Sequence, residues 1–527
     1  MKPFLALCKV EMISLLSAMN LLSSKKKKPF AAPLAALIGI GIMAYIGTVY
    51  ALPMAQVMLP LLLGDLYWAQ MVLIAFILCL CFTFVAGSGM LFGGKDMDFL
   101  FSLPLPSHTI LLCKMIALYA ENLLFSCGML IPAGVIYVIH SYFSVNFVVS
   151  LIVLCLTLPL LATIFSGILG FVVSFLSSLT PYKNLFSIIL GAGGMALMFW
   201  AIFTMQTSLS NETQLLAMRQ TLWNVVPMLE WICLSLAGIQ SMGILWFALV
   251  CVGSLIGFLA VFSPSYHSIV LRLANRTYNR NFKMKAQNAA SISMALFKKE
   301  AGRFFSTPIY LMNCGTGVIM MVLAGGYLLV QPDTVLQIAQ LLNISPAQEA
   351  MLLASVGGFC CWIAPTSVVS ISLEGKYLWL LQSAPVSAHR ILMIKTLFSF
   401  VVFLPGVLAL LLAGQIALQF PLLVLVGCLV LSLVALWFGS VLGTVINLHM
   451  PRLDAPNDAV VIKQSGSAMV QCFVGMGLIT VLVGGWFMLP VSDTAYFILC
   501  IVLLAIASLG LHIHLAKNSE KLFTNLS

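Results

Sequence analysis

The chain alternates between long apolar runs and short polar segments. Runs of about 20 apolar residues are typical of transmembrane helices, and the pattern predicts twelve of them. The first half holds Ala31–Leu52, Met71–Phe92, Met115–Ile139, Phe147–Leu176, Leu185–Met205 and Ile244–Phe262. The second half holds Ile309–Val330, Met351–Ile371, Thr396–Leu412, Leu422–Ile446, Met469–Leu489 and Tyr496–Leu515. No polar segment is long enough for a soluble domain, so we expect an all-α polytopic membrane protein.

Charged residues in the predicted loops sort by side of the membrane. Twelve spans place both termini on one side, and the run Lys25–Lys28 favours the cytoplasm. Of the 25 Lys and Arg residues, only Arg219 then lies outside. The external loops instead carry the acidic residues Asp65, Glu212, Glu230, Asp333, Glu349 and Asp493. This sorting also explains the formal charge of +10 without a nucleic-acid partner.

The two halves of the chain share a repeated loop. Gly94–Lys114 (GKDMDFLFSLPLPSHTILLCK) and Gly375–Lys395 (GKYLWLLQSAPVSAHRILMIK) are identical at nine of 21 positions without a gap. Each copy follows the second predicted span of its half. Upstream, Leu7–Glu11 resembles Leu296–Glu300, each just before a first span. We therefore expect two tandem six-span halves, residues 1–270 and 271–527. Because six is even, they are parallel repeats.

The start of the first copy nearly matches a nucleotide-binding P-loop. Gly89, Gly94 and Lys95 fit G-x-x-x-x-G-K-[ST], but Asp96 replaces the Ser or Thr. Ser370 stands at the position of Gly89 in the second copy, so this part does not repeat. A P-loop also needs a preceding strand, whereas a membrane span is predicted here. We expect no ATP site in this chain.

The repeated loop is predicted to form a short cytoplasmic helix. In the first copy the helix is expected between Lys95 and Leu103, ended by Pro104 and Pro106, with Ser107 as N-cap of the next span. In the second copy it precedes Pro385. Such a helix either lies among lipid headgroups or docks into a partner. Its occurrence once in each half favours a two-fold-symmetric soluble partner.

Taken in this order, these features resemble the permease of type-2 ATP-binding-cassette exporters, in the form with both halves fused. The loop Pro451–Asp458 is also similar to a segment of such permeases. The resemblance implies amphipathic elbow helices at Phe4–Ala18, with Lys9 and Glu11, and at Ser291–Phe304, with Lys299 and Glu300. It also implies plasma-membrane location in a bacterial cell.

The same resemblance implies that the repeated loops are coupling helices for a separate ATPase dimer. ATP and Mg would lie on that partner, so the chain itself is expected to be no enzyme and to carry no cofactor. Membrane lipids are further partners, and the substrate stays open. The implied docking residues are Lys95, Asp96, Asp98, Phe99, Phe101, Pro104, Lys376, Tyr377, Trp379, Leu380 and Pro385.

The chain departs from this family between the fifth and sixth spans. The first half has a long external segment, Gln206–Gly243, where the family often places short re-entrant helices. The second half has only Pro490–Thr494. We therefore expect asymmetric gating on the external side.

Few residues offer chemistry inside the spans. Glu121 is the acidic residue placed within a span, seven residues after Lys114 and so ~10 Å along the helix. It is either part of a pathway or a neutral, hydrogen-bonded carboxyl, and Val402 occupies the duplicate position. The 14 Cys lie mostly in apolar runs, and no Cys or His spacing suits a metal. We predict no metal site.

Two other function classes fit less well. A secondary transporter of the major-facilitator kind also has two parallel six-span halves, but it needs charged residues for ion coupling. A membrane-embedded enzyme would need paired His, Asp or Glu residues in the spans.

The linker Ser263–Gln287 is expected to be a solvated cytoplasmic tether.

Overall fold

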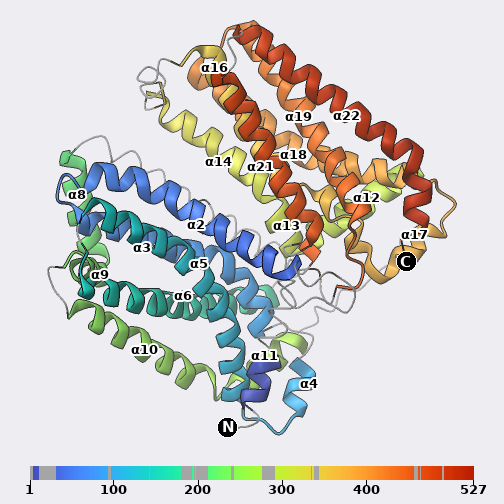
Figure 1. Ribbon diagram of the computed structural model, residues 1–527. Coiled ribbons are helices and arrows are strands. Elements are labelled where there is room, and N and C mark those ends of the chain that lie inside the picture. Colours follow the sequence, from blue (N-terminus) through green and yellow to red (C-terminus); the bar gives the residue numbers. More distant parts are fainter. Residues whose placement is uncertain are drawn as a thin grey trace. The chain divides into compact units, whose positions relative to one another are not determined.

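The computed structural model is helical throughout the part of the chain that it describes (Figure 1). This part comprises residues 4–10, 31–92, 97–141, 143–179, 193–194, 196, 212–238, 242–275, 291–333, 335–336, 344–455, 458, 461–462, 465–488 and 492–526. The chain forms two compact units, Met1–Asn281 and Phe282–Ser527. The division falls eleven residues after the boundary expected from the repeat.

Eight helical segments of the described chain are long and apolar enough to cross a membrane. Their interior-facing residues are buried, and many outward-facing side chains are exposed apolar residues, as lipid contact requires. The segments are Ser107–His140, Val145–Leu176, Gly243–Phe262, Pro346–Gln382, Ala388–Leu418, Leu422–His449, Gly466–Trp486 and Asp493–Thr524. The chain is therefore a multi-pass membrane protein.

The first unit is a helical bundle around an aromatic core. Trp68, Tyr137 and Phe147 pack with ring centroids 5.1 to 5.6 Å apart. Helices α2 and α5 touch at Gly47, where a Cβ atom would lie 2.8 Å from the carbonyl oxygen of Gly128. The helices are α2 (Ala31–Met58), α3 (Gly64–Phe92), α4 (Met97–Ser102), α5 (Ser107–His140), α6 (Val145–Leu179), α8 (Glu212–Val225), α9 (Pro227–Leu236), α10 (Gly243–Phe262) and α11 (Tyr266–Asn275).

The second unit is also a helical bundle. Its central helices α18 and α19 pack against each other and against α16 and α22. The elements are α12 (Ile292–Ser306), α13 (Pro308–Cys314), α14 (Thr316–Val330), α16 (Pro346–Ile363), η2 (Thr366–Val368), η3 (Ser372–Tyr377), α17 (Leu378–Gln382), α18 (Ala388–Leu418), α19 (Leu422–His449), α21 (Gly466–Met488) and α22 (Asp493–Thr524).

Helices occupy the described parts of the predicted spans, although Ile309–Val330 is divided between α13 and α14, and three helix ends differ from the prediction. Helix α16 ends at Ile363, before the expected Ile371, because Pro365 interrupts it. Helix α18 begins at Ala388, eight residues before the expected Thr396. Helix α22 continues nine residues beyond Leu515. The predicted span Leu185–Met205 lies outside the described residues apart from 193, 194 and 196. The total of twelve stays a prediction.

One expected helix cap is wrong. Ser107 is the first residue of α5, and Pro106 occupies the N-cap position without a side-chain hydrogen bond. Pro106 has φ −69° and ψ 144°, the extended conformation of an N-cap residue, and its carbonyl accepts a hydrogen bond of 2.9 Å from the Thr109 amide.

The long segment before α10 folds into helices α8 and α9. Helix α9 buries Leu229, Ile232 and Leu236 in the core of the first unit. On α8, Arg219 forms an ion pair of 2.5 Å with the buried Asp65 at the start of α3. Both residues were predicted outside, and this contact places them on the same side of the unit.

Candidate functional site

Helix α12 turns Lys299, Glu300 and Arg303 toward the protein, whereas Lys298 is exposed. Ser291 caps the helix by accepting a hydrogen bond of 3.4 Å from the Met294 amide. Glu300 is buried, whereas Ile292 and Phe305 are exposed. Exposed apolar residues beside buried charged ones suit a helix lying at the edge of a membrane. The predicted second elbow, Ser291–Phe304, coincides with this helix, which exposes Ile292, Met294 and Phe305 but buries Phe304.

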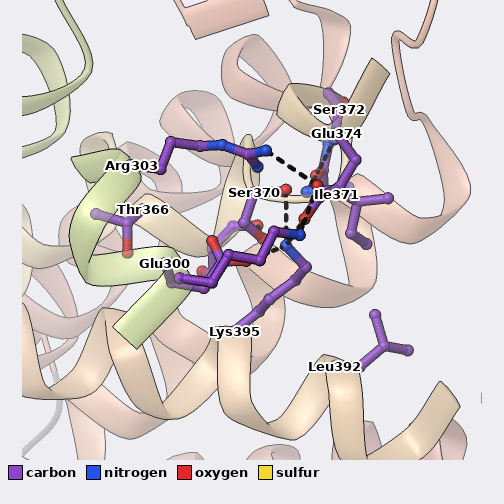
Figure 2. A network of polar contacts seen from close by, with 12 residues as sticks. Glu300, Arg303, Thr366, Ser370, Ile371, Ser372, Glu374, Leu392 and Lys395 are labelled. Atoms are coloured by element: carbon purple, nitrogen blue, oxygen red, sulfur yellow. Dashed lines mark hydrogen bonds and ion pairs between the residues drawn. The ribbon is translucent and has the colours of Figure 1, made fainter. Parts of the chain in front are cut away.

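Lys395 lies at the centre of a buried polar network (Figure 2). Its side chain, on α18, is only 1% exposed. The ammonium donates to Glu300 Oε1 at 2.6 Å, to Glu374 Oε1 at 2.7 Å and to the Ser370 carbonyl at 3.0 Å. These three bonds use all three ammonium protons. One side chain thus joins α12, the turn after α16, and α18.

Glu374, on η3, gathers two further cations from α12. Lys299 Nζ lies 2.8 Å from both carboxylate oxygens, and Arg303 Nη2 lies 3.0 Å from Oε2. Burial lowers the pKa of the Lys299 ammonium, and the Glu374 carboxylate opposes that shift. Because every member has a charged partner, the network avoids the cost of an isolated buried charge.

The backbone around Glu374 is fixed by a buried amide. Asn447, on α19, accepts hydrogen bonds from the amides of Ile371 at 2.8 Å and Ser372 at 3.2 Å. Its own amide donates to Ser372 Oγ at 2.7 Å and Ser467 Oγ at 3.2 Å. The chain then turns at Gly375, whose φ of 52° and ψ of −132° favour glycine. Asn447 therefore fixes the backbone before Glu374, and the conformation of Gly375 fixes it afterwards.

Beyond this turn the chain presents an apolar surface. Tyr377, Trp379 and Leu380 are 69%, 59% and 52% exposed. Leu378 and Leu381 point the other way and are buried. We use the name docking segment for residues 376–385. It contains the predicted residues Lys376, Tyr377, Trp379, Leu380 and Pro385, of which Lys376 and Pro385 are also exposed.

The C-terminal end of α22 holds the docking segment at its far end. Gln382 Nε2 donates to the carbonyls of Phe523 at 2.8 Å and Leu526 at 2.9 Å. Glu520 Oε1 accepts from the Ala388 amide at 2.9 Å, and so caps α18. Phe523 is buried in one cluster with Leu378 and Leu381. These contacts explain why α22 extends past its predicted span.

The first unit has a related arrangement around α4. Met97 and Leu100 are buried against Tyr266 of α11, whose hydroxyl donates to the Leu91 carbonyl at 2.5 Å. Phe101 packs on His267 with ring centroids 4.5 Å apart. The start of the linker, expected to be a solvated tether, is therefore a helix that buries Tyr266 and Val270 in one cluster with Met97 and Leu100 of α4. The sequence shows an apolar side there, and the expectation overlooked it.

The remaining predicted residues of the first unit are described in part. Lys95, Asp96 and Glu11 lie outside the described residues, and only the backbone of Asp98 and Phe99 is described. Lys9 and Pro104 are exposed. Lys114 is buried on α5, as its counterpart Lys395 is on α18.

Glu121 is partly exposed on α5. The neighbouring Asn122 is buried and donates to Thr163 Oγ1 on α6 at 3.1 Å. Thr83 and Ser166 form a second buried contact, of 2.6 Å, between α3 and α6. Sequence reasoning missed these contacts, because single polar residues in apolar runs carry no periodic signal. Whether Glu121 belongs to a transport pathway or is a neutral, hydrogen-bonded carboxyl stays a prediction.

The described residues hold no group of three or more His, Cys, Asp or Glu that could bind a metal ion. The buried network supports the docking segment, which exposes aromatic side chains. Comparisons with protein-family models and with curated proteins give no match for this chain.

Proposed function

We propose that the chain is the transmembrane permease subunit of an ATP-binding-cassette exporter. It would have twelve spans in two tandem parallel halves and would dock a separate ATPase dimer that carries ATP and Mg. The chain itself would hydrolyse no ATP. The order of elements supports this proposal, because an elbow helix, a pair of spans and a short exposed segment follow one another in the second unit.

The observation that carries the proposal is the exposed surface of the docking segment. Tyr377, Trp379 and Leu380 expose large apolar area on a turn that the structure fixes by buried charges and amides. Aromatic residues presented on a rigid support are typical centres of protein interfaces. A polar surface would be expected here if this loop met only water.

The buried network suggests how movement would pass into the membrane. Glu374 adjoins the docking segment, and its partners lie on α12 and α18. A displacement of the segment would therefore shift those helices, because breaking the network would strand buried charges. ATP-driven closure of the partner would in this way move the two halves and open a central pathway.

A pull-down of the tagged chain from its native membrane tests this proposal. We expect a stoichiometric ATPase to co-purify with the unchanged chain and to be lost with Trp379→Asp. Leu62→Asp is the matched control, because Leu62 is 92% exposed in the connection between α2 and α3. It should leave the complex intact.

Two outcomes would count against the proposal. One is a Trp379→Asp variant that retains the ATPase in full. The other is a chain that purifies alone and transports in vesicles under an ion gradient. The second result would favour the secondary transporter, and Glu121 would then be the first residue to change.

A further inference from the structure

The buried network contains more positive than negative charge. Its cations are Lys299, Arg303 and Lys395, and its anions are Glu300 and Glu374. Three positive and two negative side chains leave one unbalanced positive charge. Lys395 is enclosed by both carboxylates, so the excess is not located there.

The excess lies at the edge of the network, on α12. Lys299 and Arg303 share the single carboxylate of Glu374, and their side chains are 37% and 25% exposed. Arg303 Nη1 is buried without a hydrogen-bond partner among the described residues. Nη1 is closed to the surface, but a guanidinium has five donors, and the exposed parts of the Arg303 and Lys299 side chains can meet an anion from outside.

The surroundings of this edge indicate where the anion comes from. Met294 and Phe305 are exposed on one side of α12 together with Lys298, whereas Phe304 is buried. A helix with an exposed apolar side and cations beside it lies at the boundary between acyl chains and headgroups. Lipid phosphates are found at that depth, and anionic leaflets attract such cations.

We propose that Lys299 and Arg303 bind the phosphate of an anionic phospholipid headgroup. The phosphate oxygens would accept charge-assisted hydrogen bonds from the two side chains, and the acyl chains would cover the exposed apolar side of α12. The bound lipid would neutralise the network. This site does not depend on an ATPase partner, since it requires only a membrane.

The test measures the affinity of the purified full chain for phosphatidylglycerol in neutral detergent, by the rise of its Tm with added lipid. Arg303→Gln should weaken this affinity at least about tenfold, as expected for loss of a charge-assisted contact. Lys517→Gln, which removes an exposed lysine on α22, should bind like the unchanged chain. Phosphatidylcholine should give a much smaller rise than phosphatidylglycerol.

Two further arms keep the test decisive. Arg303→Lys retains the charge but loses the planar fork, so it measures the site even if Arg303→Gln fails to fold. We expect Arg303→Lys to bind more weakly than the unchanged chain. If Arg303→Lys and the unchanged chain bind phosphatidylglycerol with equal affinity, the proposal is overturned. Inorganic phosphate is the second arm. If it raises the Tm by itself and abolishes the rise caused by phosphatidylglycerol, the site binds free phosphate and not a lipid.

Discussion

Lys395 is the residue on which the buried network depends most. Lys395→Met would leave Glu300 without its cation and Glu374 with only the two cations of α12. Removing one partner from a buried ion pair typically costs about 3–5 kcal/mol, and we expect a loss of that size. Thermal unfolding in neutral detergent measures it.

A double variant and a surface control sharpen this prediction. Lys395→Met combined with Glu300→Gln should recover part of the lost stability, because the second change removes the unpaired carboxylate. Lys376→Met, at an exposed position, should stay within about 0.5 kcal/mol of the unchanged chain. A Lys395→Met variant as stable as this control would contradict the network.

Gly375 is required by its backbone conformation and not by crowding. The nearest atom to an added Cβ is the Leu453 carbonyl oxygen at 3.5 Å, but φ is +52°. Gly375→Ala should therefore lower stability by about 1–3 kcal/mol. Gly326→Ala, in helix α14 with no atom within 4 Å, should be neutral or stabilising. If the two variants unfolded at the same temperature, the expected backbone strain of alanine at position 375 would be disproved.

At the scale of elements, the end of α22 is predicted to hold the docking segment in place. Glu520→Ala removes the acceptor for the Ala388 amide and should cost about 1 kcal/mol, as for other helix caps. Amide exchange across residues 376–388 should then quicken by roughly fivefold. Lys521→Ala, one residue along and exposed, should leave exchange unchanged. Equal protection in both variants would argue against the contact.

The helices could be predicted from the sequence, but their polar contacts could not. Apolar runs predicted α10, α19 and α21 within a few residues, since lipid requires continuous apolar length. They could not predict the end of α22, because its last turns are held by tertiary contacts with Gln382 and Ala388.

Several residues of the buried network stood out in the sequence, but their contacts could not be predicted. Glu300 and Lys299 stood out through the repeated elbow pattern, and Lys395 through the repeated loop. Their meeting depends on how α12 crosses α18, which no local pattern specifies. Lys395 precedes an apolar run, where a lysine side chain commonly extends to the membrane interface, so its position did not indicate a buried carboxylate partner. The expected span began at Thr396, just after it.

At the scale of the whole molecule, the charge pattern predicts opposite sides for two exposed positions. Leu62→Cys should react with a membrane-impermeant maleimide in intact cells, because the connection of α2 to α3 is predicted outside. Tyr377→Cys should react only after permeabilisation. Each is compared with the unchanged chain, whose own Cys are mostly buried. The reverse pattern would invert the predicted topology.

The buried network also sets an order for biosynthesis. Glu300 and Lys395 are 95 residues apart in the chain, so the carboxylate emerges from the ribosome well before its cation. At ~5–20 residues per second, this delay is about 5–20 seconds. During that interval α12 has charged groups and no place to bury them. The buried ion pair of α12 can therefore form only after Lys395 of α18 has been made.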